Sequence, residues 1–394
     1  MSSTDAAEAM MRDGMWRGGS ASGLGQILKS RGGVIGVWRG RRRRYRFHVA
    51  TLKDIAQETG LGLGTVSRAL SGAPKVSPAT RRKVEQAAKR LGYQTNALAR
   101  ALRQSQSKAV GLVIPDIENE FYTSGAAILQ DVFAREGYRL VLCCSNSDPE
   151  TDAELLASLV ERRVDGIAHT PCSPQGAQVI RTLSPTLPIV EYARRSELDS
   201  VDSVTGDEQR GSAEIVDHLV GLGHASIAMI TGPKDLSTTQ ARLAGFDDAC
   251  RRQRLRRRDC PRLVGAYDAE WGREATLRIL RDHPGVTAIY ASSSRIVLGV
   301  LETLREAGVS IPDDMSVVGF LNPRWYGVAS PPLTTYELPL KEMGDIAARL
   351  LLQRIDAGSD QSSHERRSVR IEGRLVVRQS TSRPRVGPVP RRMA

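Results

Sequence analysis

Long apolar runs, paired cysteines and export signals are all missing from this 394-residue sequence. No uninterrupted apolar stretch approaches the length of a membrane-spanning helix, and the N-terminus shows neither the apolar segment nor the cleavage site of a secretory signal. Its five cysteines form no CxxC pair and no disulfide framework; they are Cys143, Cys144, Cys172, Cys250 and Cys260. These absences argue against membrane and disulfide-rich secreted classes and predict a cytoplasmic protein with reduced thiols.

Sequence patterns of common catalytic and metal sites are missing as well. There is no GxSxG, HExxH or GK[ST] segment, and the six histidines are scattered. His224, at the end of GLGH, is better explained as a group at a helix end than as a catalyst. We therefore expect no catalytic residues, no metal and no cofactor, and an enzyme is the weaker alternative.

Charge is distributed unevenly along the chain. The first 108 residues carry 21 Lys and Arg against 6 Asp and Glu, whereas the remaining 286 carry 35 against 38. The net charge of +12 therefore belongs to the N-terminal quarter, which is attached to a slightly acidic body. A basic module of this size predicts a polyanionic partner such as a nucleic acid.

Residues 1–50 are rich in Gly, Ser and Arg, include the run RGRRRRYR at 39–46, and show no periodicity. We predict a disordered basic extension, because little apolar surface is available to offset the entropy of ordering. A solvated tail explains the arginine run more simply than phosphate binding does. If Val49 is encoded by GTG, translation starts there and residues 1–48 are not translated; the intact mass of the native protein tests this.

Three short helices are predicted after this extension. The first begins at Thr51, which forms a capping-box pattern with Asp54, and ends at Gly60. A second fits Leu63–Leu70, and Ser77-Pro78 provides the N-cap and the first-turn proline of a third. Two short helices joined at a glycine and braced by a third predict a helix-turn-helix, whose second helix enters the major groove of DNA.

The glycines of GLGLGTVSRAL (60–70) raise a competing interpretation, a loop that binds phosphate. Such a loop needs a strand before its glycines, whereas LKDIAQET has helical periodicity, and the spacing GxGxG does not match a dinucleotide loop. We therefore prefer the helix-turn-helix. A small helical bundle with a solvated basic face remains the plainer alternative to DNA binding.

Beyond Ser107, short apolar runs alternate with helical segments. The runs are VGLVI, RLVLCC, VDGIA, LPIVEY, SIAMI, TAIYA and MSVVGF. This alternation predicts parallel sheets with helices on both faces. Roughly 280 residues is long for one such sheet, so we expect two α/β lobes.

Residues 51–103 resemble the DNA-binding headpiece of the LacI/GalR repressors almost end to end, most specifically in TVSRAL combined with RLGY. The resemblance continues in the same chain order through VDGI, GHASIAMITGP, RLAGF, SVVGF and PPLTT, and covers about residues 51–380. It implies an α-helical helix-turn-helix headpiece (51–95), a hinge helix and linker (96–108), an α/β two-lobed periplasmic-binding-protein-like (type I) effector core (109–380) and a C-terminal tail (381–394).

The resemblance also implies a function and a set of DNA contacts. It implies a transcriptional regulator, most simply a repressor, that binds double-stranded operator DNA as a homodimer. Phosphate contacts fall on Thr51, Leu52, Lys75, Val76, Ser77 and Thr80. Base-reading positions are Leu63, Gly64 and Arg68, and the further DNA-facing positions are Thr65, Ser67 and Tyr93.

In the hinge segment NALARALR, the matching positions are Asn96, Ala99 and Leu102. Leu102 is the candidate wedge between bases in the minor groove, and its alternative role is packing under the body. Because family members commonly have a larger, often polar residue where Gly64 stands, we expect specificity to rest on Arg68, Leu63 and the hinge.

For the core, the resemblance implies a small-molecule effector bound between one lobe (109–206 with about 334–357) and another (207–333 with 358–380). The cleft-lining positions carried over are Asn119, Phe121, Arg194, Arg242, Tyr267, Trp271, Ser294 and Asn322. Sugar-binding members often have Asp where this sequence reads Ala193, Ser294 and Leu321. Because carboxylates there accept hydrogen bonds from sugar hydroxyls, their loss beside two retained arginines favours an anionic effector, such as a sugar acid or a phosphorylated sugar, over a neutral sugar.

Effector binding is expected to change the relative position of the lobes, which sets the hinge spacing in the dimer and thereby the affinity for DNA. The absence of a C-terminal leucine heptad favours a dimer over a tetramer. Two alternatives keep the fold: a cytoplasmic small-molecule-binding protein without a regulatory role, and an architectural DNA-binding protein without an effector. The intact helix-turn-helix argues against the first, and an effect of a small molecule on DNA affinity would exclude the second.

Overall fold

The computed structural model describes residues 50–70, 76–93, 106–173, 176–183, 187–196, 201–358 and 366–385. The chain divides into two compact units, Met1–Thr95 and Asn96–Ala394. The predicted N-terminal extension and four predicted DNA contacts lie outside the described residues, namely Lys75, Asn96, Ala99 and Leu102. No helix in the described ranges is long and apolar enough to cross a membrane.

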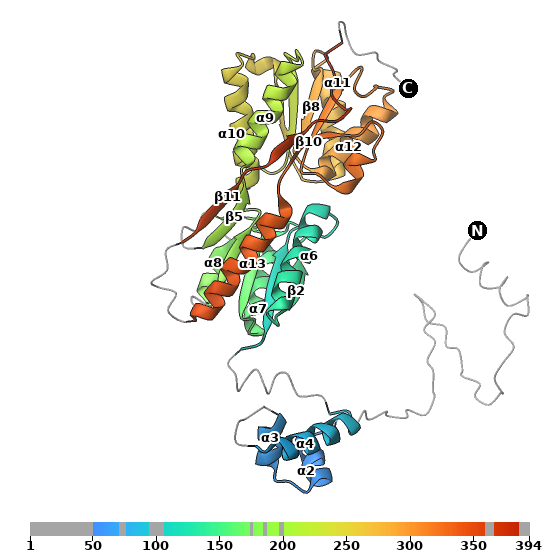
Figure 1. The fold of residues 1–394 in the computed structure, drawn as a ribbon. Helices are drawn as coiled ribbons and strands as arrows, with labels where there is room; N and C mark the ends of the chain where they lie inside the picture. Colours follow the sequence, from blue (N-terminus) through green and yellow to red (C-terminus); the bar gives the residue numbers. More distant parts are fainter. Residues whose placement is uncertain are drawn as a thin grey trace, which may run out of the picture. The chain divides into compact units, whose positions relative to one another are not determined.

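The first unit contains the three predicted helices (Figure 1), which are α2 (Leu52–Thr59), α3 (Leu63–Leu70) and α4 (Pro78–Arg90). The Asp54 carboxylate accepts hydrogen bonds from the backbone N–H of Thr51 at 2.6 Å and from its hydroxyl at 2.8 Å, as the capping box predicts. Gly60 ends α2 in a left-handed conformation (φ 69°), which a glycine adopts without the steric penalty of a Cβ.

A small core holds these helices together. It consists of Ile55, Val66, Ala69, Val84, Ala87 and Ala88, which recur at helical spacing along the three elements. The hydroxyl of Ser77 accepts the N–H of Thr80 at 3.2 Å and fixes the start of α4. The prediction of three helices, with caps at the starts of the first and the third, is therefore confirmed.

The second unit contains two sheets, and the first has the strand order β11-β5-β4-β3-β1-β2. Its strands are β1 (Ala109–Ile114), β2 (Arg139–Cys144), β3 (Gly166–His169), β4 (Ile189–Tyr192), β5 (Asp202–Gly206) and β11 (Ser368–Ile371), all paired in parallel. One face is covered by α6 (Glu120–Arg135) and α13 (Leu340–Ala357), the other by α7 (Pro149–Glu161) and α8 (Gly176–Leu183).

The second sheet has the order β12-β10-β9-β8-β6-β7. Its strands are β6 (Ile227–Thr231), β7 (Arg262–Val264), β8 (Ala288–Ala291), β9 (Ser316–Phe320), β10 (Thr334–Glu337) and β12 (Arg374–Val376), and only the β10–β12 pair in this sheet is antiparallel. Helices α9 (Glu208–Gly221) and α10 (Ser237–Arg252) cover one face, α11 (Ala269–Asp282) and α12 (Ser294–Glu306) the other. Two lobes with helices on both faces match the predicted fold class.

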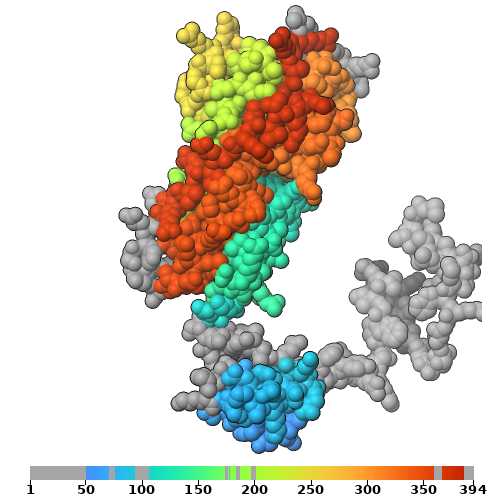
Figure 2. All heavy atoms as spheres, in the orientation of Figure 1, coloured from blue at the N-terminus to red at the C-terminus, as the bar shows by residue number. Residues whose placement is uncertain are grey.

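The C-terminal assignment to lobes is wrong at two strands. Residues 334–357 were expected in the first lobe, but they are divided between the two lobes. β10 pairs with β9 of the second sheet, and only α13 packs on the first sheet. Conversely, β11 pairs with β5 of the first sheet, although residues 358–380 are expected in the second lobe. Each sheet thus gains a strand from the C-terminal segment, which pairs the backbone groups of an otherwise open edge. Figure 2 shows this segment running across both lobes beside α13.

Candidate nucleic-acid interface and ligand cleft

Helix α3 presents a solvent-facing surface at its N-terminal end. Val66 and Ala69 are buried against α2 and α4, whereas Leu63 is 47% exposed and Gly64 and Arg68 are exposed as well. Arg68 Nε donates a hydrogen bond to the carbonyl of Gly64 at 3.1 Å, so this side chain lies over the gap that the missing Gly64 side chain leaves. Thr65 and Ser67, at the other predicted positions on this helix, are half-buried.

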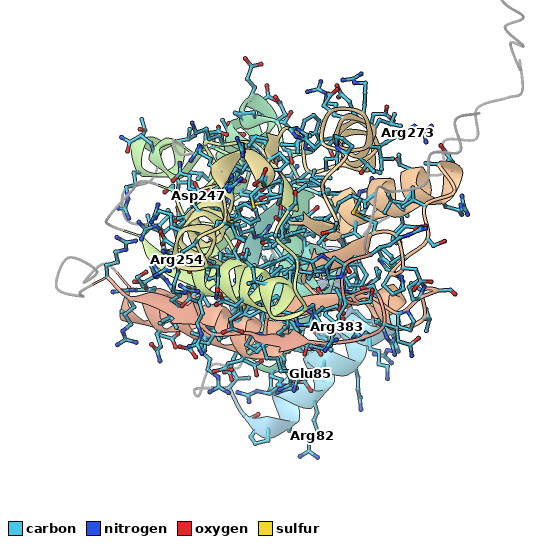
Figure 3. The ribbon with its side chains drawn as sticks, turned by 90° about the horizontal axis from the view of Figure 1, so that it is seen from above. Arg82, Glu85, Asp247, Arg254, Arg273 and Arg383 are labelled. Atoms are coloured by element: carbon cyan, nitrogen blue, oxygen red, sulfur yellow. The ribbon has the colours of Figure 1, made fainter. Side chains whose placement is uncertain are left out.

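The predicted phosphate contacts surround two helix N-termini, where backbone N–H groups favour anions. Thr51 caps α2, and Ser77 and Thr80 join their hydroxyls at 2.8 Å at the start of α4. The side chains of Leu52 and Val76 pack on the headpiece core. Tyr93, predicted as a further DNA-facing position, also packs there, and its backbone N–H donates to the carbonyl of Ala88 at 2.8 Å. Figure 3 shows Arg82 pointing outward from α4, so this helix adds positive charge to the solvent-facing side.

In the core, a narrow cleft lies between the two sheets and is lined from both lobes. Five of the eight predicted effector residues line it: Asn119, Phe121, Arg194, Arg242 and Tyr267. The sequence did not single out several other lining residues, namely Asp116, Tyr122, Ser147, Glu208, Thr238 and Ser293. Most of these residues sit where a strand ends or a helix begins, which is the edge at which α/β sheets bind ligands.

Three predicted effector residues lie outside this cleft. The indole N–H of Trp271 donates to the carbonyl of Thr231 at 3.0 Å, which ties this ring to the second sheet. Ser294 and Asn322 instead line a wider groove beside α13, where the Asn322 amide donates to Glu337 at 2.9 Å. None of these three residues lines the cleft together with Arg194 and Arg242.

Arg242 is held by a buried ion pair. Its Nε donates to a carboxylate oxygen of Glu208 at 2.6 Å, and both side chains are 6% exposed. A second guanidinium nitrogen donates to the carbonyl of Ser292 at 2.5 Å. Burial opposes the charge of Arg242, but Glu208 and the neighbouring tyrosines outweigh it and raise its pKa, so the guanidinium stays protonated. Glu208 neutralises this charge, so Arg242 does not make the cleft positive.

Arg194 is the arginine of the cleft lining that has no carboxylate partner in the described residues. One guanidinium nitrogen donates to the carbonyl of Pro171 at 3.4 Å, and the guanidinium carbon lies 5.7 Å from the ring centre of Tyr122 and 5.5 Å from that of Tyr267. Within the described residues no carboxylate lies within ion-pairing distance of Arg194, and its buried Nε has no hydrogen-bond partner there. The remaining cleft charge, Asp116, lies 3.9 Å from Arg295, whose guanidinium is paired more closely with Glu118 at 2.6 Å.

Tyr267 connects the two arginines to α10. Its hydroxyl pairs with that of Thr239 at 2.8 Å and accepts from Arg242 at 3.4 Å. Burial alone raises the pKa of Tyr267, but Arg242, Thr239 and Arg194 outweigh burial and lower it. A lowered pKa makes the phenol a stronger hydrogen-bond donor.

Two strand ends at the cleft adopt left-handed backbone. Ala193 follows β4 with φ 66° and Leu321 follows β9 with φ 68°, one in each lobe. These are two of the three positions where sugar-binding family members often carry Asp, a residue that tolerates this conformation better than Ala or Leu. This chain adopts the left-handed conformation at both positions without an Asp side chain.

Comparisons with known proteins agree with this geometry. Residues 51–96 match the profile of the bacterial regulatory proteins of the lacI family, and residues 216–381 match that of a periplasmic binding protein-like domain. Catabolite control protein A of Priestia megaterium is 31% identical over 332 residues, which span 84% of this chain and 99% of that protein. The transcriptional regulator DegA of Bacillus subtilis (strain 168) is 30% identical over 335 residues, 84% of this chain and 98% of that protein.

Among solved structures, the lac repressor dimer bound to operator and an anti-inducer matches with a TM-score of 0.74 and 27% identity, over 84% of this chain and 99% of that chain. The complex of the regulator CelR with cellobiose matches with a TM-score of 0.63 and 29% identity, over 84% and 99%. A helix-turn-helix headpiece joined to a two-lobed ligand-binding core defines a DNA-binding transcriptional repressor. This chain belongs to the lacI family of bacterial regulatory proteins.

Proposed function

We propose that the chain is a homodimeric repressor whose operator affinity is set by a monoanionic sugar derivative, a sugar acid in the first place, bound in the cleft between the lobes. The observation that carries the effector class is Arg194, a buried guanidinium at the cleft without a carboxylate partner in the described residues. Burying an unpaired charge is costly, and an anionic ligand would remove that cost.

The balance of charge around the cleft favours one negative group on the ligand over two. Arg242 is paired with Glu208, which leaves Arg194 as the lining arginine without a carboxylate partner in the described residues. Asp116 shares Arg295 with Glu118, which lies closer at 2.6 Å, so a second negative group on the ligand would meet Asp116 and Glu208. A carboxylate suits this arrangement better than a phosphate, whose second charge would meet the Glu208 carboxylate. Neutral hydroxyls of the ligand have partners in Asn119, Thr238 and Tyr267.

The described cleft is narrow, with a free volume of only about 40 Å³. A sugar acid therefore enters only if the lobes separate or Arg194 and Tyr267 move, and its binding selects one lobe arrangement. The described chain crosses between the lobes three times, after β5, after β10 and after β11, and these short crossings are the natural hinges. In a dimer, the lobe arrangement would set the spacing of the two headpieces and hence operator affinity.

Relatives support the two parts of this proposal separately. The lac repressor is described as a dimer bound to operator, and other family members are described with cellobiose or ribose. These neutral sugars are ligands of those proteins. For this chain, the surroundings of Arg194 favour an anionic sugar derivative instead.

Thermal-shift measurements test the effector class directly. Gluconate and glucuronate should raise the melting temperature of the core, and glucose and ribose should not; Arg194→Gln should abolish the shift. Ribose 5-phosphate, which carries two charges, distinguishes a carboxylate site from a phosphate site. Stabilisation by neutral sugars alone would refute the anionic class while leaving the repressor assignment intact.

A further inference from the structure

Three buried ionisable side chains lie behind the cleft, on the face of the first sheet that α7 and α8 cover. His169 of β3 and Glu191 of β4 are direct neighbours in the strand register, and Ile167 and Ile189 on the same side belong to the core under these helices. Asp152 of α7 reaches down to this pair, with its carboxylate oxygen 2.9 Å from Nε2 of His169. All three side chains are at most 1% exposed.

Glu191 is linked to the effector cleft through the backbone. One carboxylate oxygen accepts the N–H of Ser196 at 2.9 Å, which closes the turn that follows β4. That turn contains Ala193, in its left-handed conformation, and Arg194. The carboxylate therefore holds the end of the segment that presents the Arg194 guanidinium to the cleft.

His169 reaches the same segment from the neighbouring strand. The next residue, Thr170, donates its hydroxyl to the carbonyl of Tyr192 at 2.9 Å, and the carbonyl of Pro171 accepts from the guanidinium of Arg194. The ring packs closely against Gly176, where a Cβ would lie 2.9 Å from the imidazole Cε1. His169 is thus continuous with the start of the loop that contacts Arg194.

The surroundings of Glu191 act on its pKa in opposite directions. Burial raises the pKa of Glu191, while Ser196, His169 and Arg366 oppose that rise. The other charged or titratable groups on this side are Asp152, Arg181 of α8 and Cys172; burial, with Asp152 adding to it, raises the pKa of the Cys172 thiol to about 12 and keeps it neutral. Glu191 also has one buried carboxylate oxygen, Oε1, without a hydrogen-bond partner in the described residues.

We propose that Glu191, packed with His169 and Asp152, positions Arg194, so that the anion affinity of the cleft changes with the protonation of Glu191. The inference rests on the proposed function, because it uses Arg194 as the anion-binding group. An ionised carboxylate holds a backbone N–H more strongly than a protonated one. The turn therefore tightens, and the affinity for a permanently ionised ligand rises, as Glu191 loses its proton.

The test uses the full chain, with gluconate as the probe because its carboxylate stays ionised above about pH 5. Gluconate affinity is measured by calorimetry between pH 5 and pH 8, and hydrogen exchange of the Ser196 amide is followed by mass spectrometry in the same buffers. Glu191→Gln keeps an acceptor for Ser196 but cannot ionise, and Glu191→Leu removes the acceptor. Glu154→Gln, on the exposed side of α7, makes the same change of charge away from Glu191.

We expect wild-type affinity and that of Glu154→Gln to rise about tenfold across this range, the scale of one charge-assisted hydrogen bond, and Glu191→Gln to show a flat profile. Glu191→Leu should speed exchange at Ser196 by about tenfold at any one pH. A Glu191→Gln protein with the wild-type pH profile would overturn the proposal, and this result does not depend on whether Glu191→Leu folds. If the wild-type protein binds no gluconate at any pH, the proposed anionic effector class is wrong. Separately, equal exchange rates of the Ser196 amide in wild type and in the Glu191 variants would overturn the proposal that Glu191 holds this turn.

Discussion

Replacing Glu208 by Gln removes one charge from the buried pair with Arg242 while keeping the size of the side chain. Both side chains are 6% exposed and their closest atoms are 2.6 Å apart, so Arg242 would be left charged in a site that water hardly reaches. Leaving one partner of a buried pair unmatched costs about 3–5 kcal/mol. We expect the lower end, about 3 kcal/mol, because Arg242 keeps its bond to the Ser292 carbonyl at 2.5 Å.

The assay is equilibrium unfolding in urea, followed by tryptophan fluorescence, since Trp271 and Trp325 both lie in the second lobe. A double variant, Glu208→Leu with Arg242→Met, removes both charges and should recover most of the loss. Asp248→Asn, which breaks an exposed ion pair with Arg251 on the same α10, should leave stability unchanged. A Glu208→Gln protein that unfolds at the wild-type urea concentration would refute the buried-pair argument.

Three further predictions follow from the same reasoning. Arg68→Ala should lower affinity for the preferred operator by about 1–3 kcal/mol and relax sequence preference in a selection from random DNA; an equal loss on all sequences would make Arg68 a phosphate contact. Gly60→Ala should destabilise the headpiece by about 1 kcal/mol in thermal unfolding, through the left-handed backbone alone, because nothing lies within 4 Å of the added carbon; an unchanged melting temperature would contradict this. Because burial raises the pKa of Glu191 from 4.5, the wild-type protein should lose stability as pH rises from about 4.5 through the raised value, and Glu191→Gln should not; parallel stability curves would count against the buried carboxylate.

Local signals in the sequence were sufficient for the headpiece. The capping box at Thr51, the left-handed stop at Gly60 and the Ser77-Pro78 start each act over a few residues, so each is readable without knowledge of the tertiary structure. The alternation of apolar runs and helices predicted two α/β lobes for a similar reason.

The pairing of strands that are far apart in the chain could not be predicted from such local signals. β10 and β11 are short, and nothing in either four-residue strand specifies which of two sheets it joins. The strands β5 and β7 have weak patterns and were missed because tertiary packing decides their formation. The eight-residue helix α8 was missed as well, although its apolar residues are well segregated.

The cleft shows the same limit. Arg194 and Arg242 were found through the family resemblance, but the neutralising role of Glu208 depends on a contact across 34 residues. From the sequence alone, Glu208 is simply an acidic residue in the first turn of a predicted helix, where such residues are common because they stabilise the helix. The pairing of charges in the cleft, on which the proposal of a monoanionic effector depends, required the structure.

The most direct test of the account is the operator affinity of the full chain with and without gluconate, in wild type and in Arg194→Gln. In electrophoretic mobility shifts, gluconate should change the operator affinity of wild type and should leave that of Arg194→Gln unaltered. Operator DNA should in turn change the affinity of wild type for gluconate by the same factor. Equal operator affinity with and without gluconate, in a wild-type protein that demonstrably binds it, would contradict the central claim that the cleft controls DNA binding.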